Sequence, residues 1–222
     1  MSIPESERDW IGLFAGHAPI TTGLDEADHA QLITFLREPV SRVMSYCQFV
    51  AEGKVPFLAA DFPSADFPLD RFLESGNEEL SNLQTKMLIN HGRSAASEQI
   101  DQMSPEAARD MALENLFGKV SQFGLQEYFD ASLLNFMMSL GWPLPFYQSI
   151  NRKDPSRLLL FKQHHLDRIA ELNSVDAELY KAARTHFLKT LKTRRITAKR
   201  IREFQGKLKA ATAHVQQSRS EE

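Results

Sequence analysis

The sequence predicts an α/β protein with a mainly parallel sheet and a helix-rich C-terminal half. Short apolar runs alternate with helical periodicity in the first part of the chain, and helical spacing dominates from about Phe161 onward. Parallel strands need crossover connections, which are usually helices. An alternation of strands and helices, followed by further helices, is therefore typical of this class.

Three short segments are predicted as strands. Trp10–Ala15 is an apolar run closed by a Gly-His-Ala-Pro loop, and Gln31–Leu36 is rich in β-branched and aromatic residues. Lys119–Leu125 is the third candidate, and Leu144–Ile150 is expected to be extended.

Six helices are predicted from apolar spacing and terminal signals. Pro39 suits the first turn of one helix and Gly53 its end, while Ser104-Pro105 provides an N-cap and a first-turn proline for the next. Gly141 ends a third. The segment 54–70 is predicted as a loop with short helical pieces. The predicted helices cover residues 39–52, 105–117, 126–140, 161–172, 175–191 and 193–217.

Composition indicates a globular chain without a strong overall charge. The 222 residues are 42% hydrophobic and 25% charged, with a net charge of −3, so no whole-protein field attracts nucleic acid or membrane. The single cysteine, Cys47, excludes an internal disulfide and a cysteine-based zinc cluster. No run of 18 apolar residues and no leader pattern is present, so the expected location is cytoplasmic.

The chain is predicted to divide into an α/β domain, residues 1–191, and a basic amphipathic helix with a disordered tail, residues 192–222. Residues 181–209 contain eleven Lys or Arg and one acid, Glu203. Ile201 and Leu208 begin a heptad-like apolar stripe, too short to establish a coiled coil. The stripe can pack on the body or join two copies, and the cations can contact an acidic glycan. Nucleic acid is not predicted as a partner, because no aromatic platform accompanies the cations.

The stretch TFLREPVSRVMSYCQF (34–49) indicates an anion site. Arg37 follows a predicted strand, at the edge where open α/β sheets bind ligands, and the next helix should offer free N–H groups. Ser41 and Ser45 share one face of that helix. A guanidinium there can bind a phosphate through paired hydrogen bonds. The alternative is an arginine paired with a carboxylate beside an ordinary helix start.

The segment ITFLREPVSRVMSY resembles the 3′-phosphate-binding segment of sulfotransferases that use PAPS (3′-phosphoadenosine 5′-phosphosulfate). The similar branch is that of heparan and uronyl 2-O-sulfotransferases and their bacterial relatives. The resemblance implies that Arg37 and Ser45 hold the 3′-phosphate of PAPS, and that a carbohydrate or glycoconjugate hydroxyl accepts the sulfo group. It also implies a three-layer sandwich like that of P-loop NTPases.

Four further segments follow in the order of that family, over about Leu13 to Leu191. They are Ala15-Gly16-His17, NLQTK (82–86), ALENLFGKVSQFGLQEYFDASL (112–133) and NSVDAELY (173–180). One family element has no counterpart in this sequence. The strand and Pro-Lys loop that grip the 5′-phosphosulfate are missing, and Ile3-Pro4-Glu5-Ser6 lacks Lys and Gly. A degenerate, non-catalytic member that keeps the fold is therefore the alternative, as is an interaction module that uses the basic helix.

The resemblance implies that His17 is the general base, because a neutral imidazole can accept the proton of the acceptor hydroxyl. It also places Arg152 and Lys153 in a basic loop over the nucleotide. The alternative for His17 is a structural histidine that is bonded to a backbone carbonyl. The alternative for Arg152 and Lys153 is a solvated turn. No metal is predicted, since the adjacent His164 and His165 should point about 100° apart on a helix.

Overall fold

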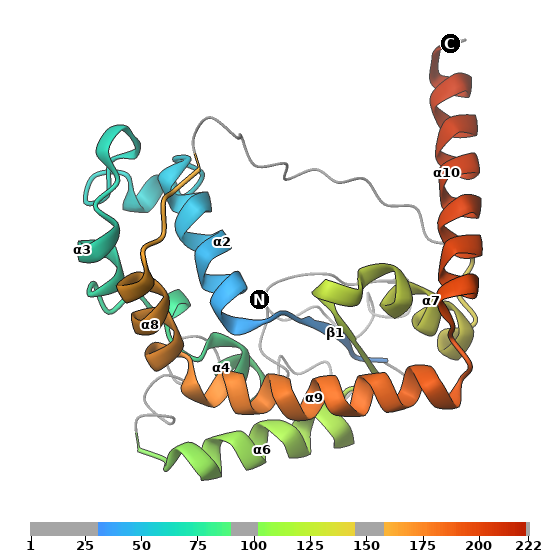
Figure 1. Cartoon of the computed structure of the whole chain (residues 1–222), viewed down its shortest axis with the longest axis horizontal. Coiled ribbons are helices and arrows are strands. Elements are labelled where there is room, and N and C mark those ends of the chain that lie inside the picture. The colour runs from blue at the N-terminus through green and yellow to red at the C-terminus, as the bar shows by residue number, and fades with distance from the viewer. Residues whose placement is uncertain (1–30, 90–101, 145–157, 221–222) are drawn as a thin grey trace, which may run out of the picture.

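The computed structural model of the chain describes residues 31–89, 102–144 and 158–220 (Figure 1). The predicted strand at 10–15, most of the extended segment at 144–150, and the candidate residues His17, Arg152 and Lys153 lie outside these ranges.

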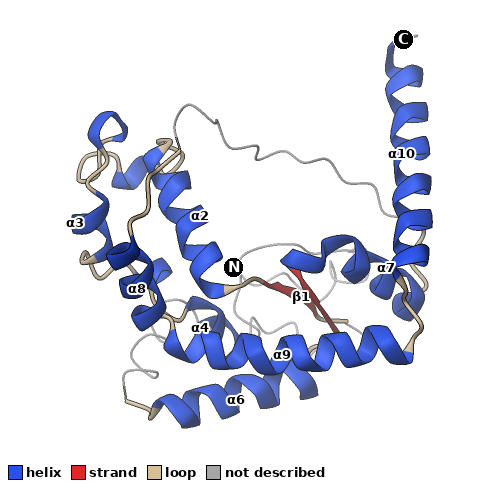
Figure 2. Cartoon of the chain, viewed as in Figure 1, coloured by secondary structure: helices blue, strands red, loops and turns tan. Residues whose placement is uncertain are grey.

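The described residues form one two-stranded parallel sheet (Figure 2). Strand β1 is Ile33–Leu36 and strand β2 is Gln122–Leu125, with Leu36 opposite Leu125. Both correspond to predicted strands, and the parallel pairing is confirmed. Because the register aligns their last residues, the segments that follow β1 and β2 leave the sheet side by side.

Helices account for most of the other described residues, and they agree with the predicted order. The Ser104 hydroxyl caps α6 by accepting from the N–H of Ala107 at 3.2 Å, and Gly141 ends α7 with a φ of +66°. The α-helices are α2 (Pro39–Ala51), α3 (Leu69–Leu73), α4 (Leu83–Ile89), α6 (Pro105–Gly118), α7 (Phe129–Leu140), α8 (Gln163–Leu172), α9 (Ser174–Thr193) and α10 (Ala198–Ser220). The 3₁₀ turns are η1 (Pro56–Leu58), η2 (Ser64–Asp66), η3 (Glu78–Leu80) and η4 (Gln126–Tyr128).

The larger apolar core joins the sheet to α4, α6, α7, α9 and the first turns of α10. At its centre Gly124 of β2 allows close packing, because a Cβ there would lie 2.6 Å from the Phe35 ring and 2.7 Å from Ser132 Cβ. The Ser132 hydroxyl accepts from the N–H of Leu125 at 3.0 Å, so α7 folds back directly onto the strand that precedes it.

A second apolar cluster joins α2 to α3 and α8. The Phe72 ring lies 4.8 Å from that of Phe62 and 5.3 Å from that of Phe67. Cys47 is fully buried in this cluster, and burial raises the pKa of its thiol to about 12. This thiol is therefore protonated and unreactive near neutral pH.

Helix α10 begins later than the sequence predicts. Residues 194–197 form a turn, in which Arg195 has a φ of +54°, so the last helix starts at Ala198 rather than Thr193. Phe204 and Leu208 are buried with the larger core, and α10 contacts α7, so its apolar stripe packs on the body. Beyond these turns α10 stands away from the rest of the molecule (Figure 1). No described helix is both long and apolar enough to cross a bilayer.

Candidate functional site

The candidate site lies at the carboxyl ends of β1 and β2, where the loop containing Arg37 and Glu38 meets the turn containing Glu127. The backbone N–H of Glu38 donates to Oε1 of Glu127 at 2.8 Å. In α/β sheets this edge is where ligands bind. The two segments belong to two separate stretches that carry the family resemblance, and the parallel register brings them together.

Gln84 holds the backbone of Arg37 at two points. The N–H of Arg37 donates to Oε1 of Gln84 at 2.8 Å, and Nε2 of Gln84 donates to the carbonyl of Arg37 at 2.9 Å. Gln84 belongs to the NLQTK segment, which therefore determines where the Arg37 side chain leaves the backbone. Arg37 itself is half-buried and has no ion-pair partner among the described residues.

The segments NLQTK and NSVDAELY cap each other's helices. The buried carboxylate of Asp176, at the start of α9, accepts from the N–H groups of Gln84 (3.1 Å) and Thr85 (2.7 Å) and from the Thr85 hydroxyl (2.6 Å). In return, Oδ1 of Asn82 accepts from the N–H groups of Val175 and Asp176, both at 3.1 Å. This exchange satisfies helix-terminal donors that would otherwise be buried without partners.

The Asn173 side chain completes this reciprocal cap, and the Tyr180 side chain joins the same helix, α9, to the strand ends. Oδ1 of Asn173 accepts from the N–H of Asn82 at 3.1 Å, and its Nδ2 donates to the carbonyl of Leu80 at 2.7 Å. The Tyr180 hydroxyl donates to Oε2 of Glu127 at 2.7 Å. The pKa of Tyr180 is raised, first by burial and then by this hydrogen bond. Glu127 therefore links the strand ends to α9.

The start of α2 differs from the sequence expectation. The Glu38 carboxylate caps the helix by accepting from the N–H of Val40 at 3.1 Å and of Ser41 at 2.7 Å. The expectation that these N–H groups would be free for an anion is therefore wrong. Ser45 lies further along the same helix and is half-buried, and within the described ranges no hydrogen bond joins it to Arg37.

Arg42 adds a second cation to this site. Its Nη2 donates to the Glu79 carbonyl at 2.7 Å, while its buried Nε has no hydrogen-bond partner within the described part of the chain. Burial lowers the pKa of Arg42, although the charges of Asp176 and Glu79 oppose the shift. The positive charge of Arg37 adds to the lowering, so two guanidinium groups act on each other here.

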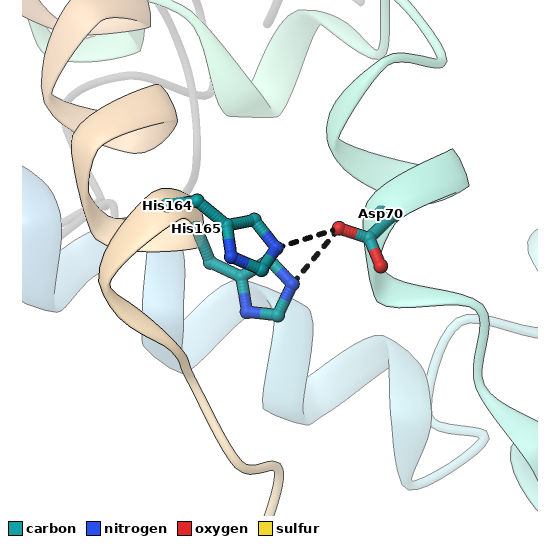
Figure 3. A group of neighbouring side chains, drawn as sticks. All are labelled: Asp70, His164 and His165. Carbon is teal, nitrogen blue, oxygen red and sulfur yellow. Dashed lines mark hydrogen bonds and ion pairs between the residues drawn. The ribbon is translucent and has the colours of Figure 1, made fainter.

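A separate cluster joins α3 to α8 (Figure 3). Nε2 of His164 and Nε2 of His165 lie 3.1 and 2.9 Å from Oδ1 of Asp70, and the hydrogen bond to His164 is the main reason why the pKa of Asp70 is lowered. The expectation that the two adjacent rings would diverge is wrong, because both reach the same oxygen.

The hydrogen bonds of His165 explain why this cluster is a weak candidate for a metal centre. The backbone N–H of Lys162 donates to Nδ1 of His165 at 3.0 Å, so a neutral ring carries its proton on Nε2 and donates it to Asp70. A metal ligand would need a free lone pair on that Nε2. The cluster is therefore best explained as a hydrogen-bonded contact between two helices.

In comparisons with known proteins, no protein-family model, curated protein or solved structure matches the chain. Arg37 and Ser45, the candidate residues from the sequence that fall within the described ranges, lie just before α2 and within it. The sequence did not predict the hydrogen bonds that Gln84, Glu127 and Asp176 make here. Asn82 could not have been found as a local N-cap, because its Oδ1 caps α9 and not α4, the helix that follows it.

Proposed function

We propose that the protein is a sulfotransferase that moves a sulfo group from PAPS to a hydroxyl of a carbohydrate or glycoconjugate. One observation supports this proposal above the others. Four segments that resemble the family, far apart in sequence, converge through hydrogen bonds at the carboxyl ends of β1 and β2. The proposed fold is the three-layer sandwich of P-loop-like proteins, to which the parallel strand pair would belong.

In this proposal the 3′-phosphate of the donor binds to the Arg37 guanidinium and the Ser45 hydroxyl. Arg37 is suited to the task because its backbone is held by Gln84 and no described carboxylate neutralises its charge. The charge of Arg42 is opposed by Asp176 and by Glu79 at 4.0 Å, but its unpartnered Nε is a sign that the site can accept an anion. The N–H groups of Val40 and Ser41 take no part, since Glu38 occupies them.

The remaining roles belong to residues outside the described ranges. PAPS supplies an activated sulfo group, whose bond to the 5′-phosphate breaks as the bond to the acceptor oxygen forms. His17 would take the acceptor's proton, which is worth roughly 10²–10⁴-fold in rate. Arg152 and Lys153 would cover the nucleotide with positive charge.

Thermal unfolding with 3′,5′-bisphosphoadenosine tests the donor site. At a hundredfold excess over Kd we expect a stabilisation of about 2.7 kcal/mol. Arg37→Ala should abolish it and Ser45→Ala should reduce it. Arg202→Ala, which changes an exposed arginine on α10, is the matched control and should keep the full shift. Adenosine 5′-phosphate, which lacks the 3′-phosphate, should shift the midpoint much less.

Transfer needs its own assay, because the sequence contains no counterpart of the phosphosulfate loop. Radiolabelled PAPS with a panel of glycans would detect turnover, and His17→Ala should remove it while leaving nucleotide binding intact. No thermal shift at millimolar nucleotide would refute the proposal. A shift that Arg37→Ala abolishes, without transfer to any glycan, would favour the non-catalytic alternative.

A further inference from the structure

A concentrated basic surface, here called the basic corner, runs along α9 and α10. It begins beside the candidate site, where Arg184 donates to the Tyr128 hydroxyl at 3.0 Å, and extends away from it to Lys209. It consists of exposed side chains on the outer face of α9, in the turn after it and on the first turns of α10. Within residues 181–209 only one acidic residue, Glu203, accompanies them. The exposed cations are Lys181, Arg184, Lys189, Lys192, Arg195, Lys199, Arg202, Lys207 and Lys209.

These cations are largely without counter-charges. Among the described residues only Lys199 has an acidic neighbour, Glu203, at 4.0 Å. The uncompensated charge points to an anionic partner from outside.

The basic corner offers charge but little else for recognition. The apolar stripe of α10 is already used, since Phe204 and Leu208 are buried in the core. No large hydrophobic side chain is exposed between Ser174 and Ala211, and the exposed aromatic ring in this range, His186, is stacked on Phe117. Sugar rings and single-stranded bases usually bind on aromatic surfaces, so these partners are not favoured.

The directions of the two helices favour an extended partner. In Figure 1 α9 runs across the lower part of the molecule, above α6, and α10 rises from its end in a different direction. A linear polymer would follow one helix and leave the other, whereas a broad anionic surface can meet cations from both. Polybasic clusters of this size are typical of proteins that adsorb to anionic lipids.

We propose that the basic corner adsorbs the protein reversibly onto the surface of an anionic lipid bilayer. The interaction is electrostatic, without insertion of apolar side chains, and it therefore weakens steeply with salt. The proposal is independent of the sulfotransferase proposal, because it uses none of the residues at the strand ends.

Vesicle co-sedimentation tests this interaction. We expect the full chain to bind phosphatidylcholine vesicles that contain phosphatidylglycerol at about 0.05 M salt, and to be released at about 0.5 M. Vesicles of phosphatidylcholine alone should not bind it. Each cation contributes about fivefold, so Lys192→Gln with Lys207→Gln should weaken binding about 25-fold. The matched control, Lys54→Gln with Lys162→Gln, removes the same charge from exposed positions away from α9 and α10 and should leave binding unchanged.

Three results would overturn the proposal. The first is no binding to anionic vesicles at low salt, and the second is equal weakening by the two double variants. The third is binding to a DNA duplex or an acidic polysaccharide with none to vesicles, which would assign the basic corner to a linear polymer. The thermal shift with 3′,5′-bisphosphoadenosine should be the same in both double variants. Failure of nucleotide binding at the donor site would thus be distinguished from failure of vesicle binding at the basic corner.

Discussion

The strand ends and the basic corner use charged residues in opposite ways. At the strand ends the polar groups that join the segments have defined partners, and the Asp176 carboxylate alone accepts three hydrogen bonds. At the basic corner the cations face solvent, and ion pairs are almost absent among the described residues. Buried polar groups need partners because burial removes water, whereas exposed charges keep their hydration.

This difference indicates how each region depends on its sequence. A partner lost from the buried network leaves an unsatisfied donor or charge, so the identity of each residue matters. At the basic corner only the total charge matters, and one lysine can replace another. Four predictions test this comparison, from the largest expected change in stability to the smallest.

Asp176→Ala should be the most damaging. It removes a fully buried carboxylate that caps α4 and opposes the charge of Arg42, and we expect the free energy of unfolding to fall by about 3–5 kcal/mol. Urea denaturation measures this loss. Glu178→Ala, an exposed acid on the same helix, should change stability by less than about 0.5 kcal/mol. Equal effects of the two variants would contradict the buried-network interpretation.

Gly124→Ala tests how closely the strand that leads to the site is packed. The new Cβ would lie 2.6 Å from the Phe35 ring, and we expect a loss of about 1–3 kcal/mol. Gly118→Ala is the control, because a Cβ there meets nothing within 4 Å. That variant should be neutral or stabilising by up to about 1 kcal/mol in the same denaturation experiment. Equal stability of the two variants would mean that the sheet can move away from α7.

Asn82 tests the reciprocal cap with two variants at one position. Asn82→Ala should lower the free energy of unfolding by about 1–2 kcal/mol, because it removes the acceptor for the N–H groups of Val175 and Asp176. Asn82→Gly should cost less, since the residue has a φ of +44°, which glycine adopts without strain. A glycine variant less stable than the alanine variant would be evidence against this explanation.

Lys192→Gln with Lys207→Gln should have the smallest effect on stability. Both side chains are exposed and have no ion-pair partner among the described residues, so we expect a change of less than about 0.5 kcal/mol. Thermal unfolding at low and high salt measures it. A loss above 1 kcal/mol would show that these cations stabilise the fold, and that the basic corner resembles the strand ends.

The structure changes the expected effect of deleting α10 on stability. The alternative of an interaction module predicts that deletion of the residues after Leu191 removes partner binding and leaves the thermal midpoint nearly unchanged. In the structure Phe204 and Leu208 are buried against the core, and Gln205 donates to Asp130 at 2.6 Å. Deletion of this helix should therefore destabilise the body, because the apolar surface of α7 would face water.

Local elements were predictable because their signals act over a few residues. Ser104-Pro105 marks the start of α6 and Gly141 the end of α7, and in both cases short-range hydrogen bonds and backbone conformation determine the result. The start of the last helix was misplaced because no glycine or proline marks the turn at residues 194–197, and the cap at Thr197, whose hydroxyl accepts from the N–H of Arg200 at 3.4 Å, was not recognised. Its position depends on contacts with α7.

By itself the sequence determined the α/β class, the two parallel strands, most helix ends and the concentration of positive charge near the C-terminus. It also suggested which segments belong to one site. Only the tertiary structure decided that Asp176 caps a helix start 91 residues away, that Glu38 occupies the start of α2, and that His164 and His165 reach one carboxylate. The reason is physical: backbone preferences are local, whereas the partner of a buried polar group is set by whichever chain segments packing brings within about 3 Å.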